Sequence, residues 1–346
     1  MKRAVKNAVK AALFIIIAAA IFFGLDNLLV RKSLYGWWNM TTKINGFFNS
    51  ENDRYDVVFC GSSHAYCSFV PLVIWEETGL DSYVIATQKQ PLWATYYYMK
   101  EIIARQHPQL IVLDCYTASK DEEYTDDATN YTLSDDFPFG INKLKMVYAC
   151  APSGSRFDLL VRFTKYHSRW SELTDEDFGF RPHTLSDWLN GYCMLTAATP
   201  NVQKPYAGAQ ELTIPLSDKN TEYLEKIIEL CREEGAELLI VKTPSNESAA
   251  ERGYYNSVAE IAQENGVTFI NYNDLYNKIG IDMSTDFFDA AHLNHRGAQK
   301  FTRYFVKTEL TGITPKSVSD YSLRLARYYR EYNGDYNPFL LKPMFA

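Results

Sequence analysis

The chain has 346 residues, of which 47% are hydrophobic and 15% aromatic, so it is long and apolar enough to bury one large core. Its net charge of −7 is uneven, because the first 32 residues hold six basic side chains and one acidic side chain. The remaining chain has 29 basic and 41 acidic side chains, a net charge of −12. Such a body matches nucleic acid poorly, and no basic stripe alternates with aromatic residues, so we expect no nucleic-acid partner.

The N-terminal segment is apolar over residues 11–30, AALFIIIAAAIFFGLDNLLV, which is near the length needed to cross a bilayer as a helix. Asp26 and Asn27 fall near one end, where they can lie at headgroup level. Four basic residues precede the segment and two follow it, which predicts a cytoplasmic N-terminus. A cleaved signal peptide is the alternative, but no small-residue cleavage site follows. We expect residues 1–32 to be a single-pass cell-membrane anchor, with the rest of the chain outside the cytoplasm.

Strand-like and helix-like segments alternate after the anchor. Strands are predicted at residues 57–60, 82–86, 110–116, 236–244 and 267–272, and helices at 71–78, 92–105, 218–234, 248–264 and 294–310. Ser217 is a good N-cap and Gly235 a good C′ residue for one of these helices. Short apolar strands separated by helices predict a mostly parallel sheet covered on both faces. The fold class is therefore a three-layer α/β/α sandwich over residues 33–310.

The alternation lapses over residues 117–210, which are aromatic and polar. We expect an irregular insertion there, or a lid over the sheet edge. Its acidic run at 121–127, DEEYTDD, lacks the turn glycine of a calcium loop, so a solvated acidic face is favoured. Residues 311–346 form a tail in which four apolar residues stand at helical spacing, which favours a helix packed on the domain over a contact with a membrane partner. These four residues are Tyr321, Leu325, Tyr328 and Tyr332.

The six cysteines show no CxxC spacing, so the sequence indicates neither a zinc site nor a redox motif. They are Cys60, Cys67, Cys115, Cys150, Cys193 and Cys231. An even number outside the cytoplasm permits disulfides. Three of them lie inside apolar periodic segments, however, where a small buried thiol is the simpler interpretation. We expect mostly free thiols.

Polar residues follow the predicted strands where a site would open. Ligands of such sheets bind beyond the carboxyl ends of the strands, and residues 61–64, Asp114 and residues 242–245 all lie there. A serine at a strand-to-helix turn becomes a nucleophile when an imidazole can accept its proton and a carboxylate orients that imidazole. Asp289 and His292, three residues apart before the last helix, have the spacing for such a pair. The other candidates, His107, His167 and His183, have no paired carboxylate motif.

Two blocks of sequence resemble a known family. GSSH at residues 61–64 and DAAHLN at residues 289–294 are similar to the first and last blocks of SGNH (GDSL-like) hydrolases, whose fold is flavodoxin-like. The G-S-S variant, the N-terminal anchor and D-x-x-H-L-N most resemble a membrane-anchored surface branch. That branch includes the D-alanine-transfer protein of teichoic acid synthesis and the SGNH-type acetyltransferases of exopolysaccharides such as alginate. The resemblance spans residues 55–310, although only its two end blocks are specific.

The resemblance implies a nucleophile at Ser63, a general base at His292 and an orienting carboxylate at Asp289. The family's second-block glycine and third-block asparagine are missing from residues 85–91, IATQKQP, and 112–119, VLDCYTAS. Losing one oxyanion donor costs about 3–4 kcal/mol of transition-state stabilisation. The backbone N–H of Ser63, and the side chains or backbone amides of Gln88 and Lys89, are the expected substitutes.

Three further residues each allow two interpretations. His64 contacts substrate or, as favoured, is a surface or capping histidine. Lys242 either binds an anionic group of the substrate or extends its ammonium from the sheet end into solvent. Asn294 belongs to the candidate substrate-binding set, but an N-cap of the last helix is its favoured role.

The leading hypothesis is an extracytoplasmic serine acyltransferase or esterase that needs no metal or cofactor. The acyl acceptor would be a hydroxyl of a surface glycan or wall polymer (O-acylation or D-alanylation) or water. By resemblance, we expect a membrane-bound O-acyltransferase as a partner. One alternative is a non-catalytic anchored protein that binds glycans or assists assembly. The other is a metal hydrolase, but the spacing of its candidate ligands matches no zinc pattern; these are His64, Asp286, Asp289, His292 and His295.

Overall fold

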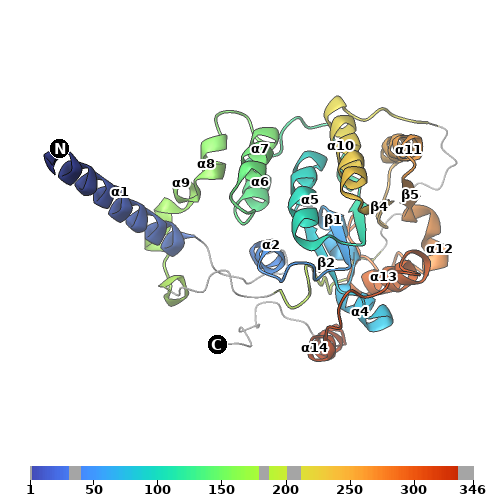
Figure 1. The fold of residues 1–346 in the computed structure, drawn as a ribbon. Helices are drawn as coiled ribbons and strands as arrows, with labels where there is room; N and C mark the ends of the chain where they lie inside the picture. The colour runs from blue at the N-terminus through green and yellow to red at the C-terminus, as the bar shows by residue number, and fades with distance from the viewer. Residues whose placement is uncertain (1, 31–39, 179–186, 201–211, 334–346) are drawn as a thin grey trace.

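The computed structural model describes residues 2–30, 40–178, 187–200 and 212–333. Its centre is one sheet of five parallel strands in the order β2-β1-β3-β4-β5 (Figure 1). The strands are β1 (Val57–Gly61), β2 (Ser82–Ala86), β3 (Leu110–Asp114), β4 (Glu237–Lys242) and β5 (Thr268–Asn271). All five predicted strands are confirmed, with their ends shifted by at most two residues.

The strands are continuous apolar runs because helices cover both faces of the sheet. Every residue of β1, β2 and β3 is buried. In the register of the sheet, Val57 of β1 lies opposite Ser82 of β2 on one side and Leu110 of β3 on the other. The parallel register brings the carboxyl ends of the strands to one edge, so the residues that follow β1, β3 and β4 lie near one another.

The predicted three-layer α/β fold is confirmed. Helices α5 (Leu92–Gln106), α10 (Asp218–Glu234) and α11 (Ala249–Glu264) lie on one face of the sheet. Helices α3 (Ser63–Ser68), α4 (Pro71–Thr78) and α13 (His295–Glu309) lie on the other face (Figure 1). The smaller helices α2 (Met40–Phe48) and α12 (Tyr276–Ile279) and the 3-10 turns η1 (Tyr116–Ser119) and η4 (Tyr272–Leu275) complete this body.

Local capping explains where the long helices begin and end. The Ser217 side chain accepts a hydrogen bond from the backbone N–H of Asn220, and Gly235 adopts the left-handed conformation after α10. Ser248 and Glu251 form a capping box at the start of α11. These signals are local in sequence, which is why the predicted ends of both helices agree with the structure.

The expectation of an irregular insertion at residues 117–210 is wrong for residues 127–178. That stretch holds four α-helices and two 3-10 turns: α6 (Asp127–Ser134), α7 (Ile141–Cys150), α8 (Arg156–Leu160), α9 (Arg162–Tyr166), η2 (His167–Ser171) and η3 (Asp175–Phe178). Each has ten residues or fewer, too few for a clear helical period to appear in the sequence. α7 packs against α5. Residues 121–124 are exposed, as a solvated acidic face requires.

The N-terminal helix α1 (Lys2–Leu29) is long and apolar enough to cross a membrane, and it projects from the body in Figure 1. The apolar side chains in the middle of α1 are exposed to the surroundings, for example Phe14 at 73% and Ile16 at 63%. α1 therefore contributes nothing to the core of the domain along most of its length.

The C-terminal helix and the cysteines follow the favoured predictions. Helix α14 (Ser322–Tyr332) packs beside α4, with Tyr328 fully buried and the Tyr321 ring 5.6 Å from the Trp75 ring. All six cysteine side chains are buried thiols, and Cys67 and Cys193 interact through a side-chain hydrogen bond.

Candidate active site

The serine of the GSSH block lies at the turn between β1 and α3. Gly61 ends β1 with a φ of +145°, a conformation that L side chains rarely adopt. A Cβ added at Gly61 would lie 2.9 Å from the carbonyl oxygen of Asp114, so β1 and β3 approach too closely there for any other residue. Ser63 is the first residue of α3 and is partly exposed at the edge of the sheet. The glycine is thus what allows the chain to turn and present the serine.

The aspartate and histidine lie on a loop closed by hydrogen bonds before α13. Phe287 and Leu293 pair as an antiparallel bridge, and the N–H of Phe288 donates to the carbonyl of His292 at 2.9 Å. The side chain of Asn294 accepts from the backbone N–H groups of Arg296 and Gly297. Asn294 therefore caps α13, as the favoured interpretation predicted. The cap fixes the direction in which the preceding loop enters the helix.

Ser63, His292 and Asp289 form a continuous chain of hydrogen-bonding groups. His292 Nε2 lies 2.8 Å from Ser63 Oγ, and His292 Nδ1 lies 3.0 Å from both carboxylate oxygens of Asp289. The sequence places these residues at opposite ends of the domain, and the fold brings them together across 229 positions. With Nδ1–H donating to the carboxylate, Nε2 is left as the acceptor for the serine proton, which is the arrangement of a serine nucleophile and its base.

The Asp289 carboxylate is held ionised beside the imidazole. Burial alone would raise the pKa of Asp289, but the hydrogen bond and charge of His292, with the backbone N–H groups of Ala291 and His292, lower the pKa below its ordinary value. Both of those N–H groups donate to Asp289 Oδ1 at 2.8 Å. An ionised carboxylate at this position orients His292 and stabilises the imidazolium that forms when His292 takes a proton.

His64 is not at the surface, so the favoured prediction for it is wrong. Its side chain is 2% exposed and stacks on the Tyr116 ring at 3.6 Å, with the His292 ring 5.0 Å away. Burial lowers the pKa of His64 well below its ordinary value, and the charges of Lys242, His292 and Lys120 lower it further. Tyr116 follows a strand far along the chain, so the sequence offers no local signal of this stack.

Lys242 is fully buried at the end of β4, so its ammonium does not extend into solvent as one interpretation required. Its Nζ donates to the Thr243 carbonyl at 2.6 Å and to the Ser245 hydroxyl at 2.7 Å. Burial lowers the pKa of Lys242, while the carboxylates of Asp114 and Glu247 oppose that change. These hydrogen bonds of Lys242 are made to the protein itself, and they hold the loop after β4.

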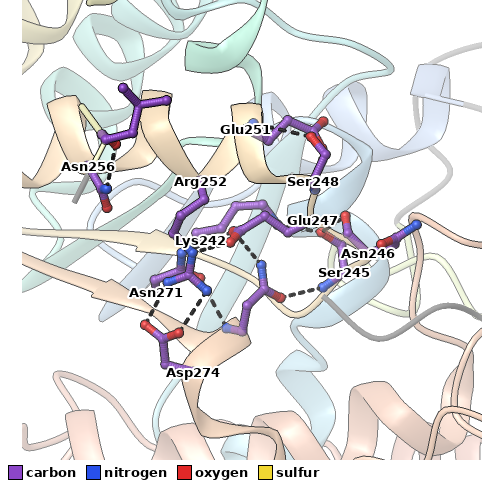
Figure 2. A network of polar contacts seen from close by, with 12 residues as sticks. Lys242, Ser245, Asn246, Glu247, Ser248, Glu251, Arg252, Asn256, Asn271 and Asp274 are labelled. Atoms are coloured by element: carbon purple, nitrogen blue, oxygen red, sulfur yellow. Dashed lines mark hydrogen bonds and ion pairs between the residues drawn. The ribbon is translucent and has the colours of Figure 1, made fainter. Parts of the chain in front are cut away.

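Figure 2 shows that this loop belongs to a larger polar network. Glu247 accepts from the side chains of Asn271 and Asn273 and forms an ion pair with Arg252, which also pairs with Asp274. The network reaches the loop before α13, because the N–H of Asn246 donates to the carbonyl of Ala290 at 2.9 Å. Residues around β4 and β5 thus support the loop that carries Asp289 and His292.

The predicted oxyanion-hole residues, Gln88 and Lys89, differ from Tyr66 in whether their side chains contact Ser63. Gln88 and Lys89 are both exposed, and Lys89 pairs with Asp126 at 3.7 Å. Among the described residues, no hydrogen bond joins either side chain to Ser63. The Tyr66 hydroxyl, in contrast, interacts with the Ser63 side chain, which opposes the effect of burial on the pKa of Tyr66. Burial raises the pKa of Tyr66 well above its ordinary value, so the hydroxyl stays protonated and can donate. Tyr66 stands three residues after Ser63 on α3, a helical spacing that could have identified it.

The remaining histidines lie elsewhere or outside the described residues. His107 has a carboxylate partner after all, because its Nδ1 lies 2.6 Å from Asp53, but this exposed pair precedes β1 and β3 at the opposite edge of the sheet. His167 is exposed, and His183 lies outside the described residues. In the part of the chain that the structure describes, no group of three or more His, Cys, Asp or Glu side chains is placed to hold a metal ion.

Comparison with known proteins adds little to this geometry. A family model that carries no functional description matches residues 213–311, and no curated protein matches the chain. One similar solved structure is described as a gut microbial diltiazem-metabolizing enzyme. It has 18% sequence identity and a TM-score of 0.27, and the similarity covers 75% of this chain and 47% of that one. The chain spans about half the length of that enzyme. The assignment of a function therefore depends on the geometry of the site.

Proposed function

We propose that this protein is a serine acyl-transfer enzyme, an O-acyltransferase or esterase of the SGNH type, with Ser63 as nucleophile. The observation that carries the proposal is the hydrogen-bonded chain from Ser63 through His292 to Asp289. The two sequence blocks that resemble the SGNH hydrolases supply these three residues, which supports the assignment of the reaction class.

The reaction follows from the positions of the atoms. Ser63 Oγ attacks the carbonyl carbon of an acyl ester while His292 Nε2 accepts the serine proton, and Asp289 stabilises the imidazolium. The tetrahedral intermediate collapses when His292 returns the proton to the departing oxygen, which leaves an acyl-serine. An acceptor hydroxyl then gives its proton to His292 and attacks the acyl carbon. The bond between the acyl carbon and Ser63 Oγ breaks, His292 returns the proton to Oγ, and the acylated acceptor leaves. The backbone N–H of Ser63 and the hydroxyl of Tyr66 are the proposed donors to the oxyanion.

The proposed setting is the outer face of a membrane. A membrane-spanning α1 with basic residues ahead of it would place the domain outside the cytoplasm. The acceptor hydroxyl would then belong to a surface glycan or wall polymer, with water as the acceptor in the esterase reaction. Activated acyl donors are made in the cytoplasm, so transfer would require a membrane-bound O-acyltransferase that passes the acyl group across. Co-purification of the two proteins in mild detergent tests this partnership, and its repeated absence would count against it.

The test of the chemistry is labelling of the full chain with a fluorophosphonate probe, together with turnover of a small acyl ester. The Ser63→Ala variant should lose both the label and the turnover. Ser62→Ala is the matched control, because Ser62 is the adjacent hydroxyl and its Oγ is buried without a hydrogen-bond partner among the described residues. Unchanged turnover in Ser63→Ala would exclude Ser63 as the nucleophile, and a chain that never labels favours the non-catalytic alternative.

A further inference from the structure

Exposed apolar side chains outside α1 gather in one part of the described chain. Most of them lie between residues 124 and 178: Tyr124, Phe139, Ile141, Tyr148, Phe157, Trp170 and Phe178. Phe157, Trp170 and Phe178, called here the juxtamembrane aromatics, lie on α8, η2 and η3 and are 63%, 72% and 65% exposed. Soluble surfaces rarely expose such large rings in one region, so these side chains need a partner.

Two of the elements that carry the juxtamembrane aromatics, η2 and η3, contact α1, and the third, α8, is joined to α1 through α9. Arg162 of α9 pairs with Asp26 of α1 at 2.9 Å, and the two side chains are only 23% and 14% exposed. The Phe22 and Phe163 rings lie 5.4 Å apart. Figure 1 shows α9 beside this end of the helix and α8 beyond α9; α9, η2 and η3 all contact α1.

A second set of contacts extends this attachment to the 3-10 turns. Arg169 of η2 donates to the carbonyl of Leu29, the last residue of α1. The same guanidinium binds the Asp177 carboxylate of η3 at 3.1 Å. The position of the juxtamembrane aromatics along the α1 axis is therefore fixed by polar contacts at Asp26 and Leu29.

The level of Asp26 in a bilayer follows from the sequence of α1. Asp26 is the first charged residue of the apolar segment and falls near its end, so in a spanning helix Asp26 lies where the hydrocarbon meets the headgroups. Elements bound at Asp26 and Leu29 lie at the same level. Aromatic rings favour this zone, with tryptophan above all, because one part of the ring can stay apolar while its edge meets polar groups.

We propose that the juxtamembrane aromatics insert into the headgroup–hydrocarbon boundary of the bilayer that α1 crosses. The segment from α8 to η3 is then a second membrane contact, and two contacts fix how the domain is oriented on the membrane. The occupant of this surface is the lipid bilayer, because the surface is continuous with a helix of membrane-spanning length and composition. The inference is independent of the chemistry at Ser63.

Spin labels on single introduced cysteines test the proposal, using the full chain in nanodiscs of phosphatidylcholine with some phosphatidylglycerol. All six native cysteines are buried, so a thiol-reactive label should attach to the folded protein at the new cysteine. Labels at Phe157→Cys, Trp170→Cys and Phe178→Cys should collide more with oxygen than with a water-soluble nickel complex. Leu323→Cys on α14, 88% exposed in the wild type, is the control and should favour the nickel complex.

The result that overturns the proposal is equal behaviour of these three labels and the Leu323→Cys label. A label at Ile17→Cys in α1 should favour oxygen most strongly; if it favours the nickel complex, α1 is not in the bilayer and the proposal fails as well. Immobilisation of the three labels only after a partner protein is added would assign the surface to that protein and also overturn the proposal.

A second measurement keeps the proposal testable if one of the single cysteine variants does not fold. A chain with Phe157→Ser, Trp170→Ser and Phe178→Ser together should keep the unfolding midpoint of the wild type, since all three side chains are exposed. A label at Leu323→Cys in that chain should tumble more freely on the nanodisc than in the wild-type background. Unchanged tumbling, with the unfolding midpoint of the wild type retained, would contradict a second membrane contact.

Discussion

Two regions deliver the candidate site, and the protein holds them in different ways. The turn after β1 belongs to the core: every residue of β1 is buried, and Gly61 is pressed against Asp114. The loop that carries Asp289 and His292 is more open, with these side chains 46% and 24% exposed. Packing fixes the proposed nucleophile, Ser63, whereas hydrogen bonds fix the proposed base and its carboxylate.

This difference separates stability from activity. A change at the β1 turn disturbs the packed sheet, so it should lower the free energy of unfolding. A change at the tip of the Asp289–His292 loop removes few packed atoms, so it should lower the rate and leave the fold intact. Measuring kcat and the free energy of unfolding on the same variants tests this separation.

The largest effect is expected from His292→Ala. Loss of the group that accepts the Ser63 proton should reduce kcat on a small acyl ester by about 10³-fold, near 4 kcal/mol. The midpoint of thermal unfolding should change little, because the side chain lies at the open tip of the loop. Asp289→Asn is the companion variant, with a smaller loss expected since it keeps the imidazole. Turnover at the wild-type rate in His292→Ala would exclude it as the base.

The second largest effect is expected from Gly61→Ala, on the free energy of unfolding. Gly61→Ala places a Cβ 2.9 Å from the Asp114 carbonyl in a backbone conformation with φ of +145°, so we expect a loss of about 2–4 kcal/mol in the free energy of unfolding. Chemical unfolding in detergent micelles measures it. Gly154→Ala is the matched control, because no atom lies within 4 Å of a Cβ built there. Equal behaviour of the two variants would contradict the packing argument.

The sequence predicts most of the framework because the signals for it are local. Apolar runs locate the strands, and Ser217, Gly235 and Ser248 locate helix ends through contacts three or four residues away. The proximity of Ser63 and His292 is also anticipated, since the order of the two blocks along an α/β chain places both at one sheet edge.

What the sequence does not predict depends on contacts between distant segments. His64 is buried because Tyr116, from the turn after β3, covers it. Lys242 is held inside by Ser245 and the loop after β4, so the position of its charge is decided by the fold. Residues 127–178 form short helices, of which α7 packs on α5 and α9 packs on α1. A helix of ten residues or fewer is too short for its sequence pattern to show which face is buried.

Asn294→Ala should lower both the free energy of unfolding and kcat, each by less than the preceding variants do. The side chain caps α13 and also donates to the Thr285 carbonyl at 2.7 Å, so we expect a loss of about 1–2 kcal/mol in stability. The loop that carries His292 enters α13 at this cap, so kcat should also fall about tenfold in Asn294→Ala. Asn294→Asp keeps an oxygen acceptor for the cap and should recover part of the stability, as measured by the unfolding midpoint. A variant that loses stability but keeps full kcat would show that the cap does not position His292.

The smallest effect concerns pH and the buried imidazole of His64. Burial first, and then the charges of Lys242, His292 and Lys120, lower the pKa of His64 in the folded protein well below its ordinary 6.5. Below pH 6.5 the unfolded chain binds a proton at this position that the folded protein does not, so stability falls as the pH falls. For one such group the loss between pH 7.5 and pH 5.5 is about 1.4 kcal/mol.

The His64→Gln variant isolates this contribution. Other groups titrate in both proteins, so the wild type should lose about 1.4 kcal/mol more than the variant when the free energy of unfolding is compared at the two pH values. The difference between the two pH values is what counts, since the variant also loses the stack on Tyr116 and is less stable at both. Equal losses in the two proteins would mean that His64 binds its proton in the folded state, which a buried imidazole beside an ammonium should not do.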